Sequence, residues 1–395
     1  KLGLARRKTG EIIITFKRTD GNTATTYLNG AQIESSTVNT SAFIALDQIV
    51  LGRTVGSQYL NCNIAEFVLL SESTDGTESI GSDAQRIIVE NYLSARYAIA
   101  LSSNDYYNGD SHADNYDFNV AGVGMSGTDT HLDSQGTGSI RITANASNLA
   151  DGEYMLWGDN GGASTFSEVS STSAYNISDL KWYMTETGTP STTGDVGAFN
   201  IVFDISAYDF GNLDVATCLD GSLFIAFDTD DDGVFNESVD DQASVVLTVI
   251  GTEASVSSTD FTLDASNDTR FALMYQSRVV YDGTNWSGTA SSSTEPDTGD
   301  DCYSLVITNN ATATLDATTA VDVFSVEVES GSTLVLDSNA FNVLTVAENL
   351  TLTGTGEFIV KGTSQLIQSH TGTTSNTGTS FYNQIVVPAG STYWY

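Results

Sequence analysis

Asn310-Ala-Thr-Ala-Thr-Leu-Asp316 returns 21 positions later as Gly331-Ser-Thr-Leu-Val-Leu-Asp337, within the last quarter of the chain. A second match joins Val328-Glu-Ser-Gly-Ser-Thr-Leu-Val-Leu336 to Val387-Pro-Ala-Gly-Ser-Thr-Tyr-Trp-Tyr395 at an offset of 59, close to three periods of about 20 residues. Short strands that recur at this period, separated by Gly, Asn and Asp turns, predict a right-handed, β-helix-like β-solenoid over residues 303–395.

The repeat also predicts which side chains face inward. Each coil of a solenoid buries its inward residues only against the coils above and below it. Leu315, Leu336 and Phe358 occupy the same point of successive coils, so we expect them to form one inward column. The chain reaches Tyr395 in the middle of a coil, and we expect the solenoid to continue beyond that residue.

The segment before the solenoid, residues 281–302, has the composition of a linker, rich in Gly, Ser, Thr, Asp and Asn. We expect Trp286 to pack on the end of the solenoid. We expect residues 104–280 to form a central β unit, because many short apolar runs alternate there with polar turns.

One segment of this central unit is suited to a particular chemistry. In Phe227-Asp-Thr-Asp-Asp-Asp-Gly-Val-Phe-Asn-Glu-Ser-Val-Asp-Asp241, the carboxylates at positions 228, 230 and 232 alternate and a glycine follows at once. Oxygen ligands crowded on a sharp turn suit Ca²⁺, and the spacing matches the first half of an EF-hand loop. Apolar runs at 222–227 and 243–250 predict strands on both sides, so we expect a calcium loop closing a β-hairpin.

The second half of this loop departs from the EF-hand pattern, because its twelfth position is Val239 rather than Glu. Asp240, Asp241 or Glu237 must therefore complete the shell. The predicted ligand set consists of the carboxylates Asp228, Asp230, Asp232 and Asp241, with the backbone carbonyl of Val234. The alternative interpretation is a solvated acidic turn in an acid-rich protein.

The charge balance restricts the possible partners. The chain of 395 residues carries 50 acidic and 14 basic side chains, a formal net charge of -36, and nine of the basic residues lie before position 97. Nucleic acid and anionic membranes bind basic surfaces, so we expect neither as a partner. Apolar residues make up 40% of the chain, which argues against disorder, and no apolar run is long enough to predict a membrane span.

The cysteines limit how many disulfides the chain can form. Cys62, Cys218 and Cys302 are far apart and form no Cys-x-x-Cys or zinc pattern. Their odd number allows one disulfide at most, and the sequence leaves its pairing open. The acidity, the calcium loop and the Ser/Thr-rich strands favour the outside of the cell.

Residues 82–100 predict the one helix of the chain. Ser82 is the N-cap and Gln85 reaches back to it, while Ile88, Tyr92 and Leu93 belong to an apolar stripe at helical spacing. The polar segment after the helix contains His112 with Asp105, Asp110 and Asp114. These four residues could bind a metal, but a flexible surface loop is the preferred interpretation.

Residues 1–80 alternate in the manner of β-strands, with strands expected at 11–16, 47–53 and 62–70 and a hairpin turn at Asn29-Gly30. Tyr27-Leu-Asn-Gly30, Leu51-Gly-Arg53 and Ile64-Ala-Glu-Phe-Val68 resemble the closing half of a concanavalin A/laminin-G-like lectin jelly roll. The resemblance implies that residues 1–103 are the C-terminal half of such a domain plus a capping helix. The missing strands are then expected before Lys1.

A second resemblance covers residues 85–280. Tyr92-Leu-Ser-Ala-Arg-Tyr-Ala-Ile99, Tyr116-Asp-Phe-Asn-Val-Ala-Gly-Val-Gly124 and Trp182-Tyr-Met-Thr-Glu-Thr-Gly188 resemble a module of large secreted surface adhesins of gliding Gram-negative bacteria. The resemblance implies an adhesin-type β-sandwich that is exported by the type IX secretion pathway. It implies no reaction.

Catalytic patterns are missing from the sequence. His112, His131 and His370 show neither triad nor metal spacing, and no Gly-rich nucleotide loop joins a strand to a helix. We therefore expect an all-β, non-enzymatic, extracellular cell-surface segment stiffened by Ca²⁺, with glycans or surface polymers as partners. The alternatives are a carbohydrate-binding module of a larger secreted enzyme, and a subunit of a surface filament or sheath, in which copies of the chain or its flanking domains associate.

Overall fold

The structure is a computed structural model. It describes residues 10–18, 23–37, 63–70, 82–187, 196–211, 213, 218–219, 222–228, 235, 245–259, 268–288, 295–296, 302–315, 320–337, 343–362, 364–368 and 381–384. Within these residues the fold is all-β apart from one α-helix and two short 3-10 turns, as the sequence predicts. None of the described helices combines the length and apolarity needed to cross a membrane.

The chain divides into two compact units. The first is built from Lys1–Gly161, Trp182–Ile201 and Ser257–Thr269, and the second from Gly162–Lys181, Val202–Val256 and Arg270–Tyr395. The first contains the N-terminal sheet and the helix, and the second contains the solenoid.

The N-terminal sheet is a three-stranded antiparallel meander of β1 (Ile14–Arg18), β2 (Thr23–Leu28) and β3 (Ala31–Thr37). Its tight turn lies at Asn29-Gly30, as expected, and both residues have positive φ angles of 47° and 80°. Residues 63–70 form no strand, although the sequence predicts one there. The expected strand at 47–53 lies outside the described residues, so the half jelly roll stays a prediction.

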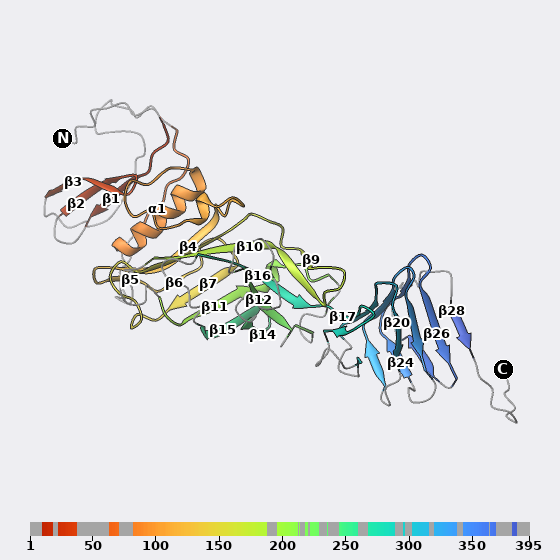
Figure 1. Cartoon of the computed structure of the whole chain (residues 1–395). Coiled ribbons are helices and arrows are strands. Elements are labelled where there is room, and N and C mark those ends of the chain that lie inside the picture. Colours follow the sequence, from red (N-terminus) through yellow and green to blue (C-terminus); the bar gives the residue numbers. More distant parts are fainter. Residues whose placement is uncertain are drawn as a thin grey trace, which may run out of the picture. The chain divides into compact units, whose positions relative to one another are not determined.

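The helix α1 runs over Asp83–Tyr97 and lies along β4 (Figure 1). The Ser82 hydroxyl caps it by accepting a hydrogen bond from the Gln85 backbone N–H at 3.1 Å, whereas the Gln85 amide side chain lies 3.3 Å from His131 Nδ1. Ala84, Ile87 and Ile88 pack in a buried apolar cluster with strand residues of the first unit.

The opposite edge of α1 is polar and still buried, which the apolar stripe does not anticipate. Arg86 and Glu90 form an ion pair one turn apart at 2.5 Å. The Arg86 guanidinium lies over the Tyr27 ring at 3.9 Å, and the Thr15 hydroxyl donates to Glu90 at 2.7 Å. Burial raises the pKa of Glu90, while the bonds from Thr15 and Arg86 act against that rise. The N-terminal sheet is therefore attached to α1 through polar contacts.

The central part of the chain is a two-sheet β-sandwich. The larger sheet has the strand order β13 (Val245–Val246), β12 (Leu223–Asp228), β16 (Thr269–Gln276), β10 (Tyr175–Thr187), β8 (Tyr154–Asp159), β4 (Phe118–Ser126), β5 (Asp129–His131), with β9 (Phe166–Glu168) beside β10. The smaller sheet has the order β14 (Thr248–Ile250), β15 (Glu253–Thr259), β11 (Phe199–Asp204), β7 (Ile140–Ala144), β6 (Asp133–Ser134). Alternate residues of β11, namely Phe199, Ile201 and Phe203, are buried, which is the pattern of a sheet with one covered face.

The solenoid has three parallel sheets (Figure 1). The first contains β17 (Arg278–Tyr281), β19 (Ser304–Ile307), β22 (Ser325–Val328) and β25 (Leu350–Leu352), with β18 (Trp286–Ser287) antiparallel at its edge. The second contains β20 (Thr312–Leu315), β23 (Thr333–Leu336), β26 (Glu357–Lys361) and β28 (Phe381–Gln384). The third contains β21 (Val321–Val323), β24 (Val343–Val346) and β27 (Gln365–Gln368).

The predicted inward column is correct at its first two members and wrong at the third. Leu315 stacks on Leu336, but the next residue in that column is Val360, because Phe358 stacks on Leu334. The step from β20 to β23 is 21 residues, whereas the step from β23 to β26 is 24, so a constant period misplaces Phe358. Leu315, Leu336 and Phe358 are all buried, so the inward assignment itself is confirmed.

Candidate functional site

The Asp-rich segment is described only at its beginning, Phe227 and Asp228, and at the buried Phe235. β12 and β13 pair antiparallel on its two sides, so the expected hairpin is present. Asp228 is the last residue of β12, and its buried carboxylate forms an ion pair with Arg270, which lies opposite it on β16. The other predicted ligands, Asp230, Asp232, Val234 and Asp241, lie outside the described residues, as do Glu237 and Asp240.

This pairing changes the fit of the predicted calcium set. The guanidinium already neutralises the Asp228 carboxylate, and both side chains are almost fully buried. A buried carboxylate needs such a partner, because an uncompensated charge in the interior is costly. Among the described residues no three His, Cys, Asp or Glu side chains are placed to hold a metal ion. Calcium binding therefore stays a prediction that depends on the carboxylates after Asp228.

The His112 segment belongs to the first unit, and its histidine packs on aromatic rings there, where the sequence favoured a flexible surface loop. The His112 ring lies 5.3 Å from the Tyr116 ring and 4.9 Å from the Tyr183 ring, measured between centroids. Its Nδ1 accepts a hydrogen bond from the Asp114 backbone N–H at 3.1 Å. Gly109–Ser111 form the 3-10 turn η1 within this segment.

Acidic side chains gather around Tyr107 in the same segment. Burial, helped by the neighbouring carboxylates Asp105 and Asp117, raises the pKa of Asp110 to about 6. The buried Tyr107 hydroxyl donates to the Tyr116 carbonyl at 2.7 Å. Burial and the repulsion among these carboxylates make the stability of the segment depend on pH.

A group of polar contacts lies in the second unit, where the sandwich strand β16 continues into the solenoid strand β17. Only Ser277 separates the two strands. The Gln276 N–H donates to the Ser222 carbonyl at 3.0 Å, and the Ser304 N–H donates to the Ser277 carbonyl at 3.0 Å. Residues 276–277 are therefore bonded on one side to the start of β12 and on the other to the start of β19.

Arg278, in the first solenoid strand β17, binds the sandwich loop at Glu168–Ala174. Its guanidinium donates to the carbonyls of Ser170 and Ser173 at 2.9 and 2.8 Å, and pairs with Glu168 at 2.8 Å. The Arg278 N–H also donates to the Ala174 carbonyl at 3.1 Å. A planar, always charged guanidinium suits several carbonyls at once better than a lysine does.

The electrostatic effect of this loop extends along the solenoid. Burial raises the pKa of Glu327 on β22, and the negative charges of Glu329 and Glu168 raise it further, while Arg278 acts in the opposite direction. The outer face of the first solenoid sheet is thus partly covered by the sandwich loop at Glu168–Ala174.

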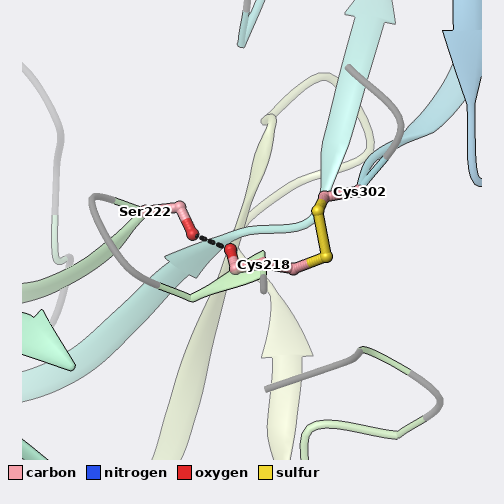
Figure 2. Close-up of a disulfide and its surroundings, with 3 residues drawn as sticks. All are labelled: Cys218, Ser222 and Cys302. Atoms are coloured by element: carbon pink, nitrogen blue, oxygen red, sulfur yellow. Dashed lines mark hydrogen bonds between the residues drawn. A yellow bond between two sulfur atoms is a disulfide. The ribbon is translucent and has the colours of Figure 1, made fainter. Parts of the chain in front are cut away.

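A disulfide joins the sandwich and the solenoid covalently at the same junction. Cys218 and Cys302 are bonded across a sequence separation of 84 residues, with their Cα atoms 5.4 Å apart. Figure 2 shows the Ser222 hydroxyl donating to the Cys218 carbonyl beside the bond. Closing a loop of this length stabilises a fold by about 4–5 kcal/mol in the chain-entropy account.

The described part of the expected linker makes contacts with the solenoid and with the sandwich. Residues 281–302 contain β18 and one half-cystine, and Trp286 packs in the buried apolar cluster of the solenoid. The linker-like composition concealed these contacts. One signal for these contacts was present in the sequence. Basic residues are scarce after position 96, and Arg270 and Arg278 are two of only five there.

Comparison with known proteins finds a similar family for one part of the chain. No curated protein matches the chain, and no solved structure matches it. A family model described as a domain of unknown function, DUF8202, matches residues 85–268, which include most of α1 and the strands from β4 to β15. The matched residues make up less than half of the chain, and so it is this central segment, from the helix through most of the sandwich, that is similar to that family.

Proposed function

We propose that this chain is a non-enzymatic segment of an extracellular adhesin, in which the sandwich holds the solenoid at a fixed junction. The observation that carries the proposal is the Cys218–Cys302 disulfide at the β16–β17 connection. Disulfides form and persist in oxidising compartments, such as the cell exterior. A covalent brace between two β units also suits a protein that must keep its shape outside the cell.

The surface chemistry supports a role in contact with polymers or other cells. Most of the acidic residues lie after position 96, together with only five basic ones. Such a surface attracts cations and repels anionic polymers, so its partners are neutral glycans or surface polymers bound with the help of Ca²⁺. The resemblance of residues 85–280 to secreted adhesin modules, with type IX export, points in the same direction.

The proposal is tested by binding and by location. Beads coated with the chain should retain neutral polysaccharides in the presence of Ca²⁺ and release them with chelator. Protein recovered from its natural source should carry Cys218 and Cys302 as a disulfide in a peptide map made without reductant. Turnover of a polysaccharide, or free thiols at both positions in the native protein, would contradict the proposal.

One observation favours a second candidate, a subunit of a surface filament. The second solenoid sheet continues in parallel register as far as β28, so each coil offers its backbone groups to the next one. Purified chain at increasing concentration would then form uniform fibres, which electron microscopy detects. A chain that stays monomeric at millimolar concentration would exclude this candidate. Glycan binding without fibres, found together with a catalytic domain in the same polypeptide, would instead identify a carbohydrate-binding module.

A further inference from the structure

The disulfide has a consequence for a chain under tension. Force applied to the two ends of the polypeptide must pass from the segment before Cys218 to the segment after Cys302. The covalent path between these residues through the sulfur atoms is short, because their Cα atoms are 5.4 Å apart. The path along the backbone is 84 residues long.

We infer that the Cys218–Cys302 bond is a force bypass, which transmits tension directly from the sandwich to the solenoid and shields the enclosed strands from being pulled out. This inference does not depend on which ligand the protein binds, or on the adhesin proposal.

The enclosed loop contains the parts of the sandwich that a pulled chain would otherwise lose. Strands β12 to β18 all lie between the two cysteines. β16 lies between β12 and β10 in the larger sheet, and its residues are buried along most of their length. Extraction of β16 would expose Phe271 and Leu273, which are fully buried. The bypass therefore protects a central strand rather than an edge.

Both anchors of the bypass are held in place locally. On one side, the N–H groups of Ser222 and Leu223 donate to the Leu219 carbonyl at 3.0 and 3.1 Å, which fixes the turn after Cys218. On the other side, the Phe324 N–H donates to the Tyr303 carbonyl at 2.8 Å, which ties the residue after Cys302 to the next coil. Force that leaves Cys302 thus enters the solenoid at β19.

The size of the effect follows from the length of the loop. An extended chain spans about 3.5 Å per residue, so a released loop of 84 residues adds about 290 Å of contour length. With the bond intact, none of this length becomes available at any force that leaves covalent bonds unbroken.

Single-molecule force spectroscopy tests the bypass directly. The full chain, carrying Cys62→Ser to remove the third thiol, is held by tags at its two ends and stretched until it is completely unfolded. At full extension, oxidised molecules should be about 290 Å shorter than the same molecules after a phosphine reductant is added to the sample chamber.

A matched variant provides the control, and a second measurement guards against misfolding. Cys218→Ser/Cys302→Ser molecules should have the long contour with or without reductant. Circular dichroism identifies whether that variant is folded, and reduction of already folded wild-type molecules gives the comparison if it is not. Equal contour lengths for the oxidised and the reduced wild-type chain would overturn the inference.

Discussion

Arg270 and Arg278 lie on consecutive strands, and each has a different kind of partner. Arg270 faces the Asp228 carboxylate on the neighbouring strand, whereas Arg278 binds the carbonyls of Ser170 and Ser173 and a half-exposed Glu168. A guanidinium is costly to bury, so the loss of a buried partner weighs more than the loss of an exposed one. This difference gives opposite expectations for substitutions around the two arginines.

For Arg278, we predict a large effect of Arg278→Ala and a small effect of Glu168→Gln. The alanine leaves two carbonyls without their charged donor, at a cost of about 2–4 kcal/mol in the free energy of unfolding. The Glu168 side chain is 56% exposed, so its removal should cost less than about 1 kcal/mol. Urea unfolding curves measure both, and equal effects would show that the ion pair rather than the carbonyl bonds holds the loop.

For the Asp-rich segment, the structure separates two roles that the sequence had merged. Asp228→Asn should destabilise the fold by about 3 kcal/mol with or without calcium, because it leaves Arg270 buried without its carboxylate. Asp230→Asn/Asp232→Asn should instead remove the difference in melting temperature between calcium and chelator, since bound metal stabilises by mass action. Differential scanning calorimetry in both buffers makes the comparison.

Two outcomes of that experiment would decide against the calcium site. One is a wild-type chain that melts at the same temperature with calcium and with chelator. The other is a double variant that keeps the full response to calcium. The acidic turn would then be the correct interpretation of the segment.

The acidic side chains near Tyr107 predict how stability varies with pH. Because the folded-state pKa of Asp110, about 6, lies above its ordinary value of 3.8, the folded protein holds this proton more tightly than the unfolded chain does. Its contribution to stability is therefore greatest below about pH 4, and it is lost as the pH rises towards 6. Asp110→Asn should flatten this part of the stability profile in urea titrations. Asp114→Asn, whose side chain is 55% exposed, is the control and should leave the profile unchanged.

At the scale of single elements, a glycine lets the backbones of two neighbouring coils come close together. A Cβ atom added at Gly356, just before β26, would lie 2.4 Å from the backbone carbonyl oxygen of Val328 in the previous coil. That oxygen accepts a hydrogen bond from the Thr353 N–H at 3.0 Å, so it cannot move away freely.

Gly356→Ala should therefore destabilise the solenoid by about 2–3 kcal/mol through overpacking. Gly251→Ala is the matched control, because a Cβ there meets open space and only the positive φ of 64° opposes it. Its net cost should be less than about 1 kcal/mol, since alanine also restricts the unfolded chain. Thermal melts of the two variants measure the difference, and equal shifts would show that the coils are loosely stacked at Val328.

The elements differ in how far their sequence determined them. The helix and the Asn29-Gly30 hairpin follow from local signals, namely a capping serine and a turn dipeptide that accepts positive φ. The solenoid follows from its repeat, but the position of Phe358 does not, because the coil length changes from 21 to 24 residues. The Cys218–Cys302 pair and the contacts of Arg278 join residues that are distant in sequence, and no local pattern encodes such a meeting.

At the scale of the whole molecule, the net charge of -36 acts on every part of the fold. Like charges on one compact body repel each other, and dissolved salt screens that repulsion over the Debye length. We predict that the melting temperature rises between about 0.01 M and about 0.5 M sodium chloride. Calcium chloride at matched ionic strength separates this screening from specific binding. A melting temperature that falls with salt would mean that favourable ion pairs, such as Arg86–Glu90, outweigh the repulsion.

The unequal coils of the solenoid bear on how such a protein can evolve. Each coil pairs with the next through parallel strands in register, and the extra residues of the longer coil enter between β23 and β25 without shifting the facing strands. A duplication of one complete coil would therefore preserve the inward pattern of every other coil, whereas an insertion of a single residue within a strand would turn its apolar face outward. The number of coils is thus open to change by gene duplication, and the length of this part of the protein can vary between relatives while its cross-section is conserved.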